Sequence, residues 1–275
     1  MNNFADVHVH MTDINFNKCQ TFLDEIAGRG ITNVALQSLT YRSIVYNLSL
    51  LYWKENYKNM EVAVFGMIHN NDIYKDISFE VQAKALVDMG CDGIKFMYSP
   101  DTRKKLGHAI CDPRYDKMFT YLEENNIPIL IHVNDPEKFW EKREMTEYEK
   151  SRGWGYFDGT YLSKQEIYEE AFAMLNKHPK LRVTFAHFFF LSCFIEEAER
   201  VMETYPNVNF DLAPGVEMFL GFSDQIDVWQ EFFEKYSDRI LFGTDCNNTK
   251  NFNPYIYQLV RMAISHDKTE FKMPC

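Results

Sequence analysis

Several features of membrane and secreted proteins are missing from this sequence. No apolar run approaches the ~18 continuous residues that a membrane-spanning helix needs. The first residues, MNNFADVHVH, lack the apolar core of a secretory signal. The six cysteines form no C-x-x-C pair. We therefore expect reduced thiols in a cytoplasmic protein that neither spans nor binds a membrane.

Positive charge and phosphate-binding motifs are also scarce. The formal net charge of −11 argues against nucleic acid or an anionic membrane surface as the partner. Neither a G-x-G-x-x-G turn nor a Walker-type loop occurs, which counts against a nucleotide-binding, doubly wound sheet. The chain is 46% hydrophobic and 25% charged, as an ordinary globular domain is. A small molecule is the expected partner, and the sequence leaves open whether the chain forms a homo-oligomer.

Short apolar runs alternate with helical patterns along the chain. Runs rich in β-branched and aliphatic residues are typical of strands buried on both faces, and they occur at residues 5–11, 31–38, 62–69, 91–98, 127–133, 182–187, 207–212 and 240–244. Helical patterns lie at about residues 16–28, 42–58, 78–89, 113–125, 163–177, 191–204, 223–236 and 254–266. Eight alternating units predict an α/β protein with a (β/α)8 TIM barrel, formed as a single domain by residues 1–275. An open doubly wound sheet is the competing interpretation.

One connection is unusually long. Residues 134–162 follow the fifth predicted strand, and structureless connections of this length are commonly lids or binding loops. The segment is rich in aromatic residues, among them Trp154 and Tyr156. These side chains either cover the barrel mouth or pack on its rim, and the sequence does not distinguish the two. We take Trp154 and Tyr156 as candidate lid or pocket residues.

Histidines and an aspartate stand at the ends of several predicted strands. His8 and His10 lie two residues apart, so on a strand both imidazoles leave from the same face and can hold one metal ion. His132, His187 and Asp245 fall at or near the ends of the fifth, sixth and eighth strands. The carboxyl ends of barrel strands form the active-site face. We therefore expect at least four of these five residues to form one metal site.

This ligand set suggests a reaction. Imidazoles with one carboxylate and an open position suit a divalent ion, zinc above all, with manganese and iron as alternatives. Such an ion makes hydroxide available near neutral pH, and an adjacent carboxylate such as that of Asp245 can take a proton and later return it. We predict a metal-dependent hydrolase of a small organic substrate. His69, after the third strand, and Asn134, next to His132, are weaker pocket candidates.

Taken in order, these motifs resemble the amidohydrolase superfamily. They resemble in particular the amidohydrolase-related family that also contains aminocarboxymuconate-semialdehyde decarboxylase. The matching pieces span residues 5–247 and are D-V-H-V-H at 6–10, I-H at 131–132, A-H at 186–187 and G-T-D at 243–245. The resemblance implies a metal held by His8, His10, His132 and Asp245, with His187 acting on the bound water or substrate.

Two departures from the family pattern qualify this expectation. Lys95 lies on the fourth strand, where binuclear members of the superfamily place a carboxylated lysine that bridges two metals. His132 and His187 would then serve a second ion. Alternatively, Lys95 pairs with a carboxylate or an acidic substrate, and we expect one ion rather than two. In addition, only 30 residues follow Asp245, where the family usually continues further.

Two other functions fit parts of the pattern. In a non-oxidative decarboxylase of a small unsaturated or aromatic carboxylic acid, the same metal would orient substrate or water and His187 would handle protons. A metal-binding barrel without catalysis is a different class of protein. The predicted ligand set argues against that class, because a structural zinc site is closed and favours cysteine ligands.

Overall fold

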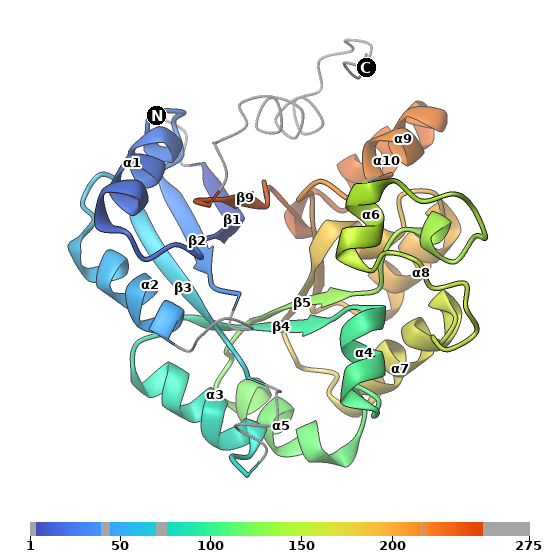
Figure 1. The fold of residues 1–275 in the computed structure, drawn as a ribbon, viewed down its shortest axis with the longest axis horizontal. Coiled ribbons are helices and arrows are strands. Elements are labelled where there is room, and N and C mark those ends of the chain that lie inside the picture. The colour runs from blue at the N-terminus through green and yellow to red at the C-terminus, as the bar shows by residue number, and fades with distance from the viewer. Residues whose placement is uncertain (1–3, 40–44, 70–75, 216, 250–275) are drawn as a thin grey trace.

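The computed structural model describes residues 4–39, 45–69, 76–215 and 217–249. The described strands form one parallel sheet in the order β8-β7-β6-β5-β4-β3-β2-β1-β9. The sheet curls round on itself, and the helices lie on its outer side (Figure 1). The strands are β1 (Ala5–His10), β2 (Asn33–Gln37), β3 (Glu61–Met67), β4 (Gly93–Tyr98), β5 (Ile129–Val133), β6 (Val183–Phe185), β7 (Val208–Asp211), β8 (Ile240–Leu241) and β9 (Cys246–Asn247).

A single short segment closes the barrel. At one end of this segment β8 pairs with β7, and at the other end β9 pairs with β1. Between them, Val7 N donates to Phe242 O at 2.9 Å and Asp245 N donates to His8 O at 2.8 Å. Residues 240–247 therefore occupy the position of the eighth strand of a (β/α)8 barrel. They bring Asp245 beside the first strand.

The helices cover the sheet with their apolar faces. The α-helices are α1 (Phe16–Ala27), α2 (Val45–Asn56), α3 (Phe79–Asp88), α4 (Pro100–Leu106), α5 (Asp116–Glu124), α6 (Glu147–Arg152), α7 (Lys164–Lys177), α8 (Ile195–Thr204), α9 (Met218–Asp224) and α10 (Ile226–Lys235). In α1, residues at helical spacing, such as Cys19, Phe22 and Ile26, are buried. The helix α7 begins with the capping box of Ser163 and Glu166.

Most predicted elements are confirmed. The eight predicted strands recur within a few residues, and β9 is an additional strand. The sequence missed the short helices α4, α6 and α9, because six- and seven-residue helices hold too few turns to show a period. The helix predicted at 254–266 and the start of the one at 42–58 lie outside the described residues. None of the described helices is both long and apolar enough to cross a membrane.

The long connection at residues 134–162 is not structureless. It contains the 3-10 turn η3 (Glu137–Phe139) and the helix α6. Trp154 stacks on Phe139 with ring centroids 5.2 Å apart, and Trp140 Nε1 donates to Leu162 O at 2.8 Å. The aromatic side chains therefore pack largely on one another, as the interpretation of a packed rim segment expects.

Candidate metal centre

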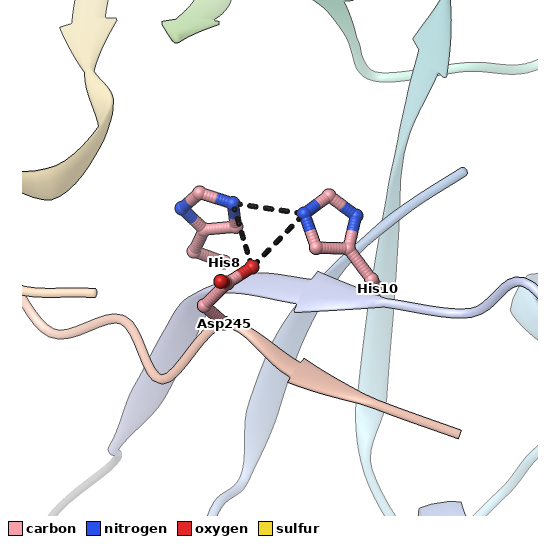
Figure 2. Close-up of side chains that lie close together, drawn as sticks. All are labelled: His8, His10 and Asp245. Atoms are coloured by element: carbon pink, nitrogen blue, oxygen red, sulfur yellow. Dashed lines mark hydrogen bonds and ion pairs between the residues drawn. The ribbon is translucent and has the colours of Figure 1, made fainter. Parts of the chain in front are cut away.

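Three side chains converge at the carboxyl end of β1. The Nε2 atoms of His8 and His10 lie 3.1 Å apart, and Asp245 Oδ1 lies 3.6 Å from the first and 3.1 Å from the second (Figure 2). His8 and His10 are buried, whereas the side chain of Asp245 is 39% exposed. The group is open to solvent on its aspartate side.

The spacing of these atoms fits a divalent ion. Ligands bound ~2.0–2.1 Å from a tetrahedral zinc lie roughly 3.3 Å apart, and the three separations here range from 3.1 to 3.6 Å. Two nitrogens and one carboxylate oxygen are a donor set that zinc and similar metals accept. Burial, and then nearby Lys95, hold the pKa of His8 well below its ordinary value. His8 is therefore neutral, as a metal ligand must be.

Asp211, at the end of β7, fixes the orientation of His8. Nδ1 of His8 donates to Asp211 Oδ2 at 2.8 Å, which leaves the lone pair of Nε2 directed at the group. The other oxygen, Asp211 Oδ1, accepts the backbone N–H groups of His187 and Ala213 at 2.8 and 3.1 Å. A carboxylate behind a ligating histidine fixes the imidazole tautomer and raises its basicity.

A second buried carboxylate fixes the backbone beneath the site. Asp6 Oδ1 accepts His8 N at 3.1 Å and Thr244 N at 3.2 Å, while Asp6 Oδ2 accepts the Thr244 hydroxyl at 2.7 Å. Burial raises the pKa of Asp6 to about 7. Asp245 itself has a φ of 53°, in the left-handed region that non-glycine residues rarely adopt. These contacts hold Asp245 in a backbone conformation that directs its carboxylate toward His8 and His10.

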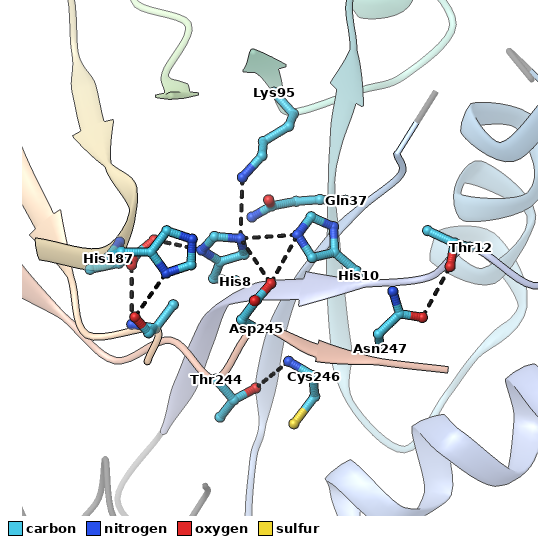
Figure 3. A network of polar contacts seen from close by, with 12 residues as sticks. His8, His10, Thr12, Gln37, Lys95, His187, Thr244, Asp245, Cys246 and Asn247 are labelled. Atoms are coloured by element: carbon cyan, nitrogen blue, oxygen red, sulfur yellow. Dashed lines mark hydrogen bonds and ion pairs between the residues drawn. The ribbon is translucent and has the colours of Figure 1, made fainter. Parts of the chain in front are cut away.

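Lys95 belongs to the same site. Its Nζ atom lies 3.2 Å from Nε2 of His8, and its side chain is almost wholly buried (Figure 3). Burial lowers the pKa of Lys95 to about 8. Close by, the buried Gln37 donates from Nε2 to Val7 O at 2.9 Å, and its Oε1 has no hydrogen-bond partner among the described residues. The site therefore contains a lysine that loses its proton readily and a free amide acceptor.

His187 lies next to the three converging residues. Its ring centroid is 5.3 Å from that of His8. Nδ1 of His187 donates to Ala213 O at 3.0 Å, so Nε2 carries the lone pair. Burial, and then the neighbouring His132, lower the pKa of His187 to about 4. A neutral imidazole with a free acceptor nitrogen can bind a metal, accept a proton or orient a substrate.

The backbone that carries His187 is strained. His187, Phe188, Phe189 and Phe190 all have φ between 53° and 56°. A left-handed conformation costs roughly 1–2 kcal/mol for each such residue. Hydrogen bonds from His187 N to Asp211 and from the Tyr168 hydroxyl to Phe189 O, both 2.8 Å, offset part of this cost. Strained backbone of this kind is common at functional sites.

The remaining candidates lie farther from the three converging residues. His132 packs edge-on against His187 with ring centroids 4.9 Å apart, and it is not one of the three residues whose ligand atoms converge. Asn134 is buried and donates from Nδ2 to Lys164 O at 2.9 Å. His69 is buried after β3, and its backbone N–H donates to Gln82.

The two loop candidates contact other parts of their own segment. Trp154 packs against Phe139, as described above, and its ring also lies beneath the Arg152 guanidinium. Tyr156 is only 3% exposed, and its hydroxyl donates to Asp135 Oδ2 at 2.6 Å. Both side chains are therefore engaged within residues 134–162.

Sequence reasoning missed Asp211, Gln37 and Asp135. Asp211 and Gln37 are each the last residue but one of a predicted strand, at 207–212 and 31–38, and a position near a strand end is the signal that identified Asp245. A polar side chain at the carboxyl end of a barrel strand points to the active-site face. This criterion identifies both Asp211 and Gln37 when it is applied to carboxylates and amides as well as to histidines. Asp135 lies three residues after His132 and had no such signal.

The described residues form a parallel (β/α)8 barrel with three metal-type ligands, His8, His10 and Asp245, at the carboxyl ends of its strands, which is the face where barrel enzymes carry their active sites. The family model described as Amidohydrolase matches residues 60–267, more than half of the chain. The protein belongs to the amidohydrolase family and is an enzyme. No curated protein matched the sequence.

Solved structures share the fold at low identity. A probable 2-pyrone-4,6-dicarboxylic acid hydrolase from Acinetobacter baumannii, solved with citric acid, is similar with a TM-score of 0.62 and 12% identity over 97% of this chain and 94% of that one. Metarhizium anisopliae IDCase has a TM-score of 0.59 and 12% identity over 98% and 92%. For 4-oxalomesaconate hydratase from Rhodopseudomonas palustris the values are 0.55 and 13% over 88% and 81%. At these identities the likeness concerns the fold alone.

Proposed function

We propose that the protein is a metal-dependent hydrolase of a small organic molecule. The observation that supports this proposal most directly is the convergence of His8 Nε2, His10 Nε2 and Asp245 Oδ1 at the open end of the barrel. Zinc is the ion we favour, with manganese or iron as alternatives, because neutral imidazoles and one carboxylate suit all three. We favour one ion over two, because the described residues hold one converging group of three ligands.

Each residue has a role in this proposal. A bound divalent ion would lower the pKa of water and polarise a carbonyl-type oxygen. Asp245, which is partly exposed, accepts a proton on its carboxylate and later returns it to the leaving group. His187 accepts a hydrogen bond from water or substrate at Nε2, since its Nδ1 is engaged by Ala213. Lys95, the buried cation beside His8, attracts an anionic group of the substrate.

The test measures the source of the oxygen in the product. Metal-loaded protein is incubated in ¹⁸O-labelled water with small lactones, esters and amides, including 2-pyrone-4,6-dicarboxylic acid. We expect ¹⁸O in the product and loss of turnover in Asp245→Asn, whereas Asp224→Asn on the exposed face of α9 serves as a control. Release of CO2 without ¹⁸O incorporation would instead identify a decarboxylase.

A further inference from the structure

A line of contacts joins the long segment at 134–162 to His132. The Tyr156 hydroxyl donates to Asp135 Oδ2 at 2.6 Å. The other carboxylate oxygen, Asp135 Oδ1, lies 3.5 Å from Nε2 of His132. That nitrogen has no hydrogen-bond partner among the described residues. The carboxylate of Asp135, which a buried tyrosine holds in place, therefore faces this nitrogen without a hydrogen bond to it.

Tyr156 is a fixed donor rather than a mobile cover. Burial, and then the adjacent Asp135 carboxylate, hold the pKa of the Tyr156 phenol well above its ordinary value, so it stays protonated. Its backbone N–H donates to Phe139 O at 2.7 Å. Its ring packs against Trp140 and Tyr161, with centroids 4.9 and 4.7 Å apart. With backbone, ring and hydroxyl all engaged, Tyr156 restricts the rotation of Asp135.

His132 needs such a partner if it serves the site. A neutral imidazole carries one N–H group, and the partner on one nitrogen decides which nitrogen keeps its lone pair. Asp135 faces Nε2, so it favours a proton there and leaves the lone pair on Nδ1. Among the described residues, the ring also packs against His187 and Phe190, with centroid distances of 4.9 and 5.5 Å. These rings set the position of His132 without selecting a tautomer.

We propose that Asp135 and Tyr156 form a positioning pair that fixes the tautomer and orientation of His132. The segment at 134–162 thereby contributes to the site through a buried hydroxyl. The inference concerns the tautomer of a histidine beside the site, and it does not depend on the hydrolase function proposed above. The contact of 3.5 Å is longer than a hydrogen bond, as catalytic contacts often are before a ligand is bound.

The tautomer can be measured directly. Metal-free protein labelled with ¹⁵N-histidine is studied by two-bond ¹H–¹⁵N correlation at mildly alkaline pH, and the His132 signals are assigned by their loss in His132→Gln. We expect the Nε2–H tautomer in several-fold excess, since the negative charge of the Asp135 carboxylate that faces Nε2 favours a proton on that nitrogen. In Asp135→Asn the excess of the Nε2–H tautomer should fall toward the smaller excess of a free neutral histidine, and Tyr156→Phe should shift the ratio in the same direction.

Tyr161→Phe is the matched control. It removes a hydroxyl from the same segment, and the ring of Tyr161 contacts Tyr156. We expect it to leave the ratio unchanged. A wild-type protein in which Nδ1 carries the proton would overturn the proposal, and so would a ratio that both variants leave unaltered. Because these spectra need neither metal nor substrate, an inactive protein with the expected tautomer would contradict the hydrolase function alone.

Discussion

Nδ1 of His8 lies 2.8 Å from Oδ2 of Asp211, although 203 positions separate the two residues in the chain. Asp211 uses both carboxylate oxygens, one for His8 and one for the N–H groups of His187 and Ala213. The buried side chain of Asp211 thus orients His8, one of the three converging residues, and it also anchors the strained backbone of His187. The first prediction follows from this double role.

We expect Asp211→Asn to weaken metal binding by ~10–100-fold, the range found when a partner behind a ligating histidine is removed. Asparagine has one acceptor oxygen, so either His8 or the two backbone N–H groups would face an NH2 group. Competition with a chelator of known affinity measures the effect. Asp224→Asn, in an exposed position on α9, should leave the affinity unchanged. Equal affinities for all three proteins would contradict the orienting role.

Metal content is a second prediction. Protein purified without chelators should carry about one divalent ion per chain, held by the three converging ligands. The double variant His8→Ala plus His10→Ala should lose this ion. His178→Ala is the control, because His178 is held by Glu123 and Asp116 outside the three-ligand group. Elemental analysis that finds no metal in folded wild-type protein would refute the metal centre.

Replacement of Asp245 should separate binding from chemistry. Asp245→Asn keeps a ligand oxygen but removes the charge and the basic group. Metal affinity should therefore fall modestly, because the histidines remain. Turnover should fall by at least ~10²–10⁴-fold, the range expected when a general acid–base group is lost. If the variant turns over normally with full metal occupancy, the base lies elsewhere and the mechanism proposed for Asp245 is wrong.

Replacement of Lys95 distinguishes a metal centre with one ion from a centre with two ions. We expect Lys95→Gln to retain the same metal stoichiometry as the wild type and to bind an anionic substrate more weakly, because a cation is lost from beside His8. Elemental analysis and KM together measure this outcome. A fall from two ions per chain to one would mean instead that a carboxylated Lys95 bridges two metals. The pKa of about 8 makes the neutral amine needed for that reaction accessible at mildly alkaline pH.

Acid should loosen the segment at 134–162. The hydrogen bond from Arg143, and then that from Thr146 N, lower the pKa of Glu149 from 4.5 to about 2. Because the folded-state pKa lies below the unfolded value, the stabilisation is complete above about pH 4.5 and is lost as the pH falls toward 2. Subtracting the fluorescence spectrum of Trp154→Phe from that of the wild type isolates the emission of Trp154, which packs in this segment.

That emission should shift to longer wavelength between these two pH values, as Trp154 separates from Phe139. In Glu149→Gln the shift should be present already at neutral pH and should depend little on acid. A wild-type signal that stays constant until the whole protein unfolds would show that Glu149 does not govern the segment.

The sequence by itself determined the alternation of strands and helices, because burial of a strand on both faces and an amphipathic helix each leave a local pattern of residues. It also placed His8 and His10 on one face, since side chains of a strand repeat every second residue. It placed His187 and Asp245 near strand ends and hence on the active-site face. It identified Lys95 only as a residue with two alternative roles.

Only the tertiary structure decided which of these side chains meet. The convergence of Asp245 with His8 depends on the closure of the barrel by residues 240–247, and the pairing of His8 with Asp211 depends on contacts across the barrel. The left-handed backbone at 187–190 contradicts the local preference of its residues and is held by Asp211 and Tyr168. Such contacts join residues far apart in the chain, so no local pattern in the sequence records them.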